Sequence, residues 1–381
     1  MNGAARSLEE KSFERHRILS MSASKTVAYE IEHTRAPIFD LCDNTLADAV
    51  EGRPVFIVID ERLWAAHGSQ VESYAQSRLH CLGVIRLPGS EATKSLDAVA
   101  ALCNAAIEKH LPRHGAFIAV GGGTILDMVG FVASIYRRGI AYVRVPTTLI
   151  GMIDVGVGIK QAINFKHKKN VLGSFYPPLC TINDVRFLWQ LPRRELACGM
   201  AEALKIFLLC DAPAFELLEE HALELMESRL RSPEPVAETF LLRAQIAMME
   251  QLSTNLFEHE LQRLVDFGHS FSPIIETMSD YAVAHGEAVA LDMLLSTAIA
   301  VGRKLCDASL MSRLIRLYGN IGLPTTHPLL SPLLMERALV ETRAHRGGVT
   351  NLVVPAGLGA AHFLQDVSYD EIALALRSIA A

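Results

Sequence analysis

The stretch GAFIAVGGGTILDMVGFVASIY, residues 115–136, indicates the fold class of this chain. It begins as a continuous apolar run, passes through three glycines and continues with apolar residues at helical spacing. Such a strand, glycine turn and helix are typical of an α/β sheet protein. Short β-branched runs occur around it at 54–60, 83–89 and 140–148, with a helical pattern at 95–111. This alternation predicts a parallel sheet covered by helices.

The pattern changes after about residue 190. Helical periodicity continues through most of the remaining chain, and β-branched runs almost disappear until 348–355. We therefore predict an α/β protein with a polar leader at 1–24 and two domains. The first, at 25–190, is expected to be a Rossmann-like domain with a parallel sheet, and the second, at 191–381, a mainly α-helical domain.

Composition narrows the class of protein. Of 381 residues, 50% are apolar and 20% are charged, which is typical of a globular protein with a large core. The formal net charge of -6 gives no indication of a nucleic-acid partner. We expect no membrane span and no signal peptide, because the apolar runs are short and the first 25 residues are polar. The seven cysteines include no CxxC pair, so we expect a reducing, cytoplasmic location.

Glycines and polar residues follow several expected strands. The triplet Gly121-Gly122-Gly123 opens a helix, Asp60 ends the first strand, and Thr147-Thr148 end another. Glu91 and Lys94 follow Pro88-Gly89 in the same way. Each of these features alone also fits a tight turn or a solvated surface. Together they predict a nucleotide site, because ligands of open α/β sheets bind at the carboxyl ends of strands and near helix N-termini.

Three residues in the second half form a candidate metal site. Glu202 lies in an expected helix with Lys205 on the same face, and His269 and His285 each adjoin a glycine. Two histidines and one carboxylate with an open position form the ligand set of a catalytic zinc. Since the three residues lie far apart in the sequence, a structural or capping role for each histidine is the alternative.

The segment from Asp154 to Asn170 is rich in glycine, lysine and asparagine. Gly156 and Gly158 permit close approach of a backbone, while Lys160 and Asn170 supply a cation and an amide. Arg137-Arg138 adds guanidinium groups that suit a phosphate. We predict an anion-binding segment, with a solvated basic loop as the alternative.

Taken together, these motifs resemble the sugar phosphate cyclases of the dehydroquinate synthase superfamily over about residues 50–360. The resemblance implies a dehydroquinate synthase-like fold, a tightly held NAD, one divalent metal (Zn²⁺ or Co²⁺) and a homodimer. It rests on GGGTILDMVGFVASIYRRG (121–139), RVPTTLIGMIDVGVGIK (144–160), KKNVLGSFYPP (168–178), LPRRELACGMAEALK (191–205), DFGHS (266–270) and HGEAVALDM (285–293).

The resemblance also implies roles for single residues. The implied metal ligands are Glu202, His269 and His285. The implied catalytic and substrate-binding residues are Lys160, Lys205, Asn170, Asp154, Asp266 and Arg138, the last reaching the site of the partner subunit. The implied NAD-binding residues are Asp60, Glu91, Lys94, Gly122, Gly123, Asp127, Thr147, Thr148 and Lys169.

Three departures from dehydroquinate synthases bear on the substrate. Gln262 replaces an arginine, Asp266 an asparagine and Pro273 a histidine. Without that arginine and with an added acid, the site should disfavour a carboxylate and accept hydroxyl groups instead. This pattern is similar to the 2-epi-5-epi-valiolone synthases, which cyclise sedoheptulose 7-phosphate.

The implied reaction is transient oxidation by NAD, phosphate elimination, reduction and an intramolecular aldol closure. Lys160, Lys205 and Arg138 would hold the phosphate, and Asn170 would orient hydroxyls. The alternatives are a related cyclase that makes 2-epi-valiolone, desmethyl-4-deoxygadusol or 3-dehydroquinate, and a metal-dependent polyol dehydrogenase. A non-catalytic NAD-binding module is a third class, against which the presence of all the expected ligands argues.

Overall fold

The computed structural model describes residues 8–13, 16–24, 26–166, 168–345 and 347–380. A six-stranded parallel sheet forms the centre of the first half, in the order β3-β10-β7-β6-β4-β5. Its strands are β3 (Glu30–His33), β4 (Val55–Asp60), β5 (Cys81–Leu87), β6 (Ala116–Gly121), β7 (Ala141–Pro146) and β10 (Cys180–Asn183). The expected parallel sheet is therefore present, with β10 and the edge strand β3 as two additional strands that the sequence did not reveal.

Alternate residues of the central strands pack on opposite faces of the sheet. Phe56 and Phe117 lie in the core shared with α3 (Leu96–Glu108) and α4 (Gly123–Ile135). Ile57 and Ile118, their neighbours, lie in the core shared with α1 (Thr45–Val50) and α2 (Glu61–Arg78). Successive side chains of a strand point to opposite faces, so continuous apolar runs are required when helices cover both.

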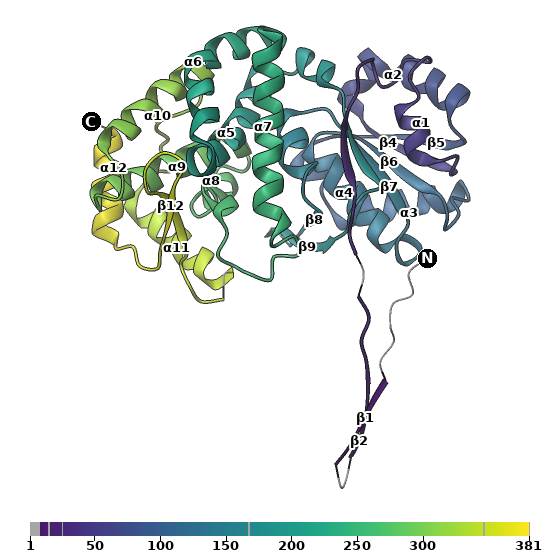
Figure 1. The fold of residues 1–381 in the computed structure, drawn as a ribbon, viewed down its shortest axis with the longest axis horizontal. Coiled ribbons are helices and arrows are strands. Elements are labelled where there is room, and N and C mark those ends of the chain that lie inside the picture. The colour runs from purple at the N-terminus through teal and green to yellow at the C-terminus, as the bar shows by residue number, and fades with distance from the viewer. Residues whose placement is uncertain (1–7, 14–15, 25, 167, 346, 381) are drawn as a thin grey trace.

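The second half is mainly helical, as expected (Figure 1). The helices α5 and α9, buried along most of their length, pack against each other at its centre. The helices are α5 (Arg193–Cys210), α6 (Ala212–Ser228), α7 (Glu234–Ser253), α8 (Ser272–Met278), α9 (His285–Gly302), α10 (Ala308–Ile321), α11 (Pro332–His345) and α12 (Tyr369–Ala380). A small antiparallel hairpin, β11 (Leu352–Pro355) and β12 (Ala361–Leu364), completes it.

Two segments contain regular structure that the sequence did not predict. The expected anion-binding segment contains a π-helical turn, Gly151–Val155, followed by an antiparallel hairpin of β8 (Lys160–Phe165) and β9 (Lys168–Phe175). Part of the polar leader also pairs, as β1 (Leu8–Phe13) with β2 (His16–Met21), and this hairpin projects from the rest of the chain (Figure 1). Short polar strands lack the apolar alternation by which a sequence reveals a strand, so both hairpins were missed.

None of the described helices is both long and apolar enough to cross a membrane.

Candidate active site

A cavity of about 650 Å³ lies between the carboxyl ends of the strands and the helical half. Most of the expected site residues line it, although they come from segments far apart in the sequence. Those that line it are Glu91, Lys94, Gly122, Gly123, Asp127, Thr148, Asp154, Lys160, Lys169, Asn170, Lys205, Asp266, His269 and His285. The fold thus gathers residues of both halves around one space.

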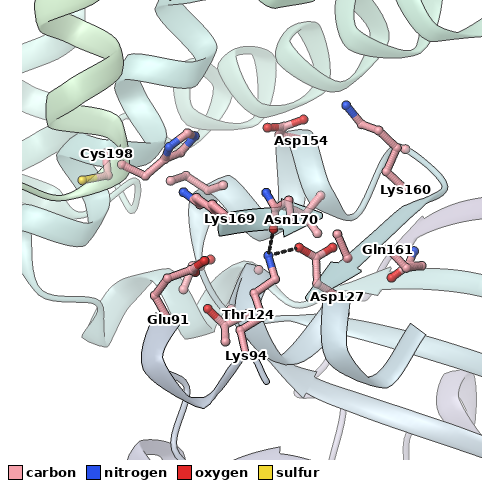
Figure 2. A pocket seen from close by; sticks show the side chains of 18 of the residues that line it. Glu91, Lys94, Thr124, Asp127, Asp154, Lys160, Gln161, Lys169, Asn170 and Cys198 are labelled. Atoms are coloured by element: carbon pink, nitrogen blue, oxygen red, sulfur yellow. Dashed lines mark hydrogen bonds and ion pairs between the residues drawn. The ribbon is translucent and has the colours of Figure 1, made fainter. Parts of the chain in front are cut away.

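We call the sheet side of this cavity the nucleotide wall, defined by Lys94, Gly122, Gly123, Asp127, Thr148, Lys169 and Asn170. Lys94 is 4% exposed and joins two of its members (Figure 2). Its ammonium nitrogen donates to Asp127 Oδ2 at 2.6 Å and to Asn170 Oδ1 at 2.7 Å. These polar side chains of the wall therefore satisfy one another's hydrogen bonds, and a ligand that binds there must replace some of those bonds.

The nucleotide wall also contains the N-terminus of α4. A Cβ atom on Gly122 would lie 3.0 Å from Thr148, and one on Gly123 would lie 3.2 Å from Val155. The N-cap of α4 receives no side-chain hydrogen bond. The glycines hence keep open a cradle of backbone N–H groups, which suits the pyrophosphate of a dinucleotide.

Four of the expected residues do not line the cavity: the fully buried Glu202, together with Asp60, Thr147 and Arg138. Asp60 is buried and caps α2 by accepting the backbone N–H of Arg62. It also accepts from the Arg62 guanidinium at 2.7 Å, and Arg62 is the residue of this pair that lines the cavity. Thr147 is buried behind the wall. Arg138 is exposed at the end of α4 and lies outside the cavity of its own chain.

The helical side brings the three expected metal ligands together. Glu202 lies on α5, His269 precedes α8, and His285 is the first residue of α9. One ligand atom from each lies within 4.8 Å of the others. The Nε2 atoms of His285 and His269 are 3.1 and 3.9 Å from Glu202 Oε1. We call these three residues, with Lys205, the metal wall.

Charge in the metal wall is concentrated and buried. The Glu202 side chain is 0% exposed, and neither of its oxygens makes a hydrogen bond of good geometry among the described residues. Lys205 Nζ lies 2.5 Å from Glu202 Oε2. Burial would raise the pKa of Glu202, but Lys205 and the two histidines together outweigh it and hold that pKa well below its usual value. A buried carboxylate without good hydrogen bonds is costly, so a divalent cation between it and two imidazoles fits this arrangement.

A further carboxylate, that of Asp154, lines the cavity near Lys205. Burial raises the pKa of Asp154 in spite of the charge of that lysine. Figure 2 shows Asp154 on the opposite side of the cavity from Lys94. A carboxyl group with a raised pKa beside a buried lysine is suited to proton transfer.

Two carboxylates that the sequence analysis missed hold the metal wall in place. Glu276 Oε1 lies 3.0 Å from His285 Nδ1, and Glu276 Oε2 accepts from Lys169 Nζ at 2.6 Å. Asp292 accepts the backbone N–H groups of the turn 270–272, just after His269. Both are acids on buried helical faces that are otherwise mostly apolar, with a serine one turn away in each case, and this feature could have revealed them.

Glu276 also separates the two histidines electrostatically. Burial lowers the pKa of His269 to about 3. Burial acts on His285 in the same direction, but the Glu276 carboxylate and the hydrogen bond with Glu202 together outweigh it and raise the pKa of His285 to about 9. His285 Nδ1 faces a carboxylate, whereas His269 Nδ1 faces the carbonyl oxygen of Phe267, and this contributes to the difference between the two imidazoles.

A line of ion pairs joins Asp266 and Lys160, which both line the cavity, through Arg263 and Glu258; we call these four residues the charged strap. Arg263 holds Asp266 through Nη2 at 2.7 Å and also pairs with Glu258. Glu258 in turn lies 2.9 Å from Lys160 Nζ. The Asp266 carboxylate is therefore paired with Arg263, whereas the sequence analysis considered it only as an acceptor for substrate hydroxyl groups. Arg263 and Glu258 were not among the expected site residues, since ion-pair partners cannot be read from sequence spacing.

Comparisons with known proteins agree with this geometry. The family model described as 3-dehydroquinate synthase N-terminal matches residues 84–198, and the C-terminal model matches residues 199–343. The 2-epi-5-epi-valiolone synthase of Streptomyces glaucescens is 41% identical over 350 residues, which cover 90% of this chain and 89% of that protein. The 3-dehydroquinate synthase of Desulforamulus reducens is 30% identical over 337 residues, which cover 88% of this chain and 93% of that protein.

A solved structure gives the same result. ValA, the 2-epi-5-epi-valiolone synthase of Streptomyces hygroscopicus subsp. jinggangensis 5008 with NAD⁺ and Zn²⁺ bound, superimposes with a TM-score of 0.89 at 40% identity. The match covers 94% of this chain and 98% of ValA. The chain therefore belongs to the 3-dehydroquinate synthase family of sugar phosphate cyclases, and it is more similar to these 2-epi-5-epi-valiolone synthases than to that 3-dehydroquinate synthase.

Proposed function

We propose that this enzyme converts sedoheptulose 7-phosphate into 2-epi-5-epi-valiolone and phosphate, as a lyase that uses NAD and one divalent metal ion. The observation that carries the proposal is the cavity itself, in which a Glu/His/His cluster faces a glycine-lined nucleotide wall. The kinship with ValA, which binds NAD⁺ and Zn²⁺, supports the same cofactors, and Co²⁺ is an alternative metal.

Each bound group supplies one kind of chemistry. NAD would accept a hydride from the substrate and later return it, so that no cofactor is consumed. The metal would polarise the oxygen of the hydroxyl group that is oxidised and of the ketone that is later reduced. Asp154 and Lys205 lie beside the Glu/His/His cluster, where they can move protons at those oxygens. Asn170 lies on the nucleotide wall, where it would orient substrate hydroxyls.

Phosphate binding must compete with ion pairs that already exist. Every lysine or arginine that lines the described cavity is paired with a carboxylate. The pairs are Arg62–Asp60, Lys94–Asp127, Lys160–Glu258, Lys169–Glu276 and Lys205–Glu202. Lys160 is 54% exposed and thus the most readily released of these cations near the metal wall. We assign it the leading contact with phosphate, with Lys205 behind it.

The same pairing supports an uncharged substrate tail. A carboxylate on the substrate would be repelled by Glu258 and Asp266, which already pair with Arg263. Asp266 can accept hydrogen bonds from substrate hydroxyl groups instead. The charged strap therefore favours a polyol over the carboxylated substrate of a 3-dehydroquinate synthase.

Two finer features belong to the same proposal. We place the division between the domains at residues 190–191, where the 3-10 turn Val185–Gln190 is followed by α5. We also propose a homodimer in which Arg138 completes the phosphate site of the other subunit, since it is exposed and lies outside its own cavity. An Arg138→Ala variant that stays dimeric by light scattering but has a raised KM would support this role, and an unchanged KM would contradict it.

The function is tested by incubating the purified full chain with NAD, Zn²⁺ and sedoheptulose 7-phosphate. We expect phosphate release, a C7 cyclitol identified by NMR as 2-epi-5-epi-valiolone, and no net gain in NADH absorbance. Stoichiometric NADH would indicate a polyol dehydrogenase instead. Turnover of the carboxylated heptulosonate phosphate in place of the heptulose would contradict the substrate assignment, and a different epimer would contradict the product assignment.

A further inference from the structure

A continuous line of ionic contacts joins the nucleotide wall to the metal wall. Lys169 lies on β9, Glu276 on α8 and His285 at the start of α9. The Lys169 ammonium donates to one oxygen of Glu276 at 2.6 Å, and His285 Nδ1 lies 3.0 Å from the other oxygen. His285 Nε2 then lies 3.1 Å from Glu202. A single carboxylate thus stands between a residue of the expected NAD pocket and an expected metal ligand.

Burial makes these two contacts of Glu276 interdependent. Its side chain is 5% exposed, so water cannot readily replace either partner. A carboxylate that is shared between two donors and withdrawn from water strengthens its bond to one donor when the other is drawn away. Any ligand that changes the charge or position of Lys169 therefore acts on His285, and the reverse also holds.

From this geometry we infer that Glu276 is a positioning residue that makes NAD and the metal ion bind cooperatively. The inference rests on the proposed function for the identity of the two ligands. A ring nitrogen that binds a metal carries no proton, so the proton of His285 must sit on Nδ1 and point at Glu276. A divalent cation on Nε2 adds positive charge on the His285 side of Glu276, which draws the carboxylate toward His285 and loosens its hold on Lys169.

Lys169 is then freer to meet the anionic nucleotide. In the opposite direction, a nucleotide that binds Lys169 weakens the contact between Lys169 and Glu276. The Glu276 carboxylate then interacts more strongly with His285, and the metal ion is bound more tightly. Each ligand therefore raises the affinity of the other, and the factor must be equal in both directions. The direction of the effect follows from the two contacts of one carboxylate, with no change of fold.

Attraction through space between a metal cation and an anionic nucleotide would also produce some cooperativity. A matched control separates the two causes. Glu195 lies on α5, lines the same cavity and pairs only loosely with Arg62, at 3.9 Å. Glu195→Gln removes the same charge from the same cavity as Glu276→Gln, but it leaves the line from Lys169 to His285 intact.

The experiment measures NAD⁺ affinity by calorimetry on the full chain, once after chelation of metal and once after reloading with Zn²⁺. We expect the wild type to bind NAD⁺ about fivefold or more tightly with Zn²⁺ than without it. Glu276→Gln should bring this ratio close to one and weaken Zn²⁺ binding by about tenfold or more. Glu195→Gln should keep the ratio of the wild type.

A second readout uses the protein reloaded with Co²⁺. Addition of NAD⁺ should change the visible absorption of Co²⁺ in the wild type, and should change it less in Glu276→Gln. If Glu276→Gln does not fold, Lys169→Met cuts the same line at its other end and should also bring the NAD⁺ ratio close to one.

A wild-type ratio of one, or an unchanged ratio in Glu276→Gln or in Lys169→Met, would overturn the inference. Because these measurements are of binding, they remain decisive even if the enzyme fails to cyclise sedoheptulose 7-phosphate. Failure of the proposed function and failure of the coupling are therefore seen in different assays.

Discussion

The two walls of the cavity are built on different principles. The metal wall consists of Glu202, Lys205 and His285 on helices and His269 in the turn before α8, supported by the buried carboxylates Glu276 and Asp292. The nucleotide wall consists of strand-end turns, the start of α4 and a hairpin, and its polar groups, such as Lys94 and Asp127, bond to one another. Packing between helices can hold metal-ligating side chains close together before a cation binds. In strand-end loops, by contrast, a large ligand can replace the existing hydrogen bonds one at a time. We therefore expect substitutions in the two walls to have separable effects.

The largest effect should follow loss of a metal-wall ligand. Glu202→Gln removes the anionic ligand and leaves Lys205 as an unpaired buried cation. We expect loss of bound metal and a fall in turnover of about a thousandfold or more, because the metal stabilises the charge that develops on substrate oxygen. Elemental analysis and phosphate release measure the two effects. His362→Ala, at an exposed histidine on β12, is the control, and full metal content in Glu202→Gln would refute the ligand assignment.

A stability effect should distinguish the support of the metal wall from its ligands. Asp292 is buried and accepts three backbone N–H groups and the hydroxyl of Ser296. In Asp292→Asn the charge is lost and an amide donor faces other donors, so we expect the free energy of unfolding to fall by about 3 kcal/mol. Urea denaturation measures this. Asp366→Asn, at a side chain that is 90% exposed, should change it very little, and equal losses in both variants would contradict the assigned role.

A substitution in the nucleotide wall should spare the metal. Lys94→Met removes the cation that joins Asp127 to Asn170. We expect NAD⁺ affinity to fall about tenfold, in line with the loss of a charge-assisted hydrogen bond, while zinc content stays as in the wild type. Calorimetry and elemental analysis test the two parts. Loss of zinc together with NAD⁺ would show that the two walls are not separable in this way.

An ion pair outside both walls gives the smallest effect and a reference for the buried pairs. Arg303 at the end of α9 pairs with Glu371 of α12 and lowers the pKa of Glu371 to about 2. A carboxyl group with a lowered pKa adds stability above its usual pKa of about 4.5, and this stability disappears as the pH falls toward 2. Glu371→Gln should thus cost about 0.5–1 kcal/mol at pH 7 and almost nothing near pH 2. Urea denaturation at several pH values would show it, and a constant difference would contradict it.

Most of the fold could be predicted from local patterns. Continuous apolar runs identified β4, β6 and β7, and apolar periodicity identified α6, α7, α9 and α10, because sheets and helices impose different repeats on the sequence. The hairpin β8–β9 was missed because its residues are largely polar or glycine. Residues expected at the metal wall do meet there, although periodicity alone could not have placed them together.

The sequence by itself determined the class of fold, the family and the residue types that the chemistry requires. Only the tertiary structure decided how the charges are shared. It paired Lys169 with Glu276 across 107 positions of sequence, Lys94 with Asn170 across 76, and Lys160 of β8 with Glu258 beyond α7. Local periodicity reports which face of an element is buried. Ion-pair partners depend instead on which elements pack against each other, and that is fixed by long-range contacts that leave no regular spacing in the chain.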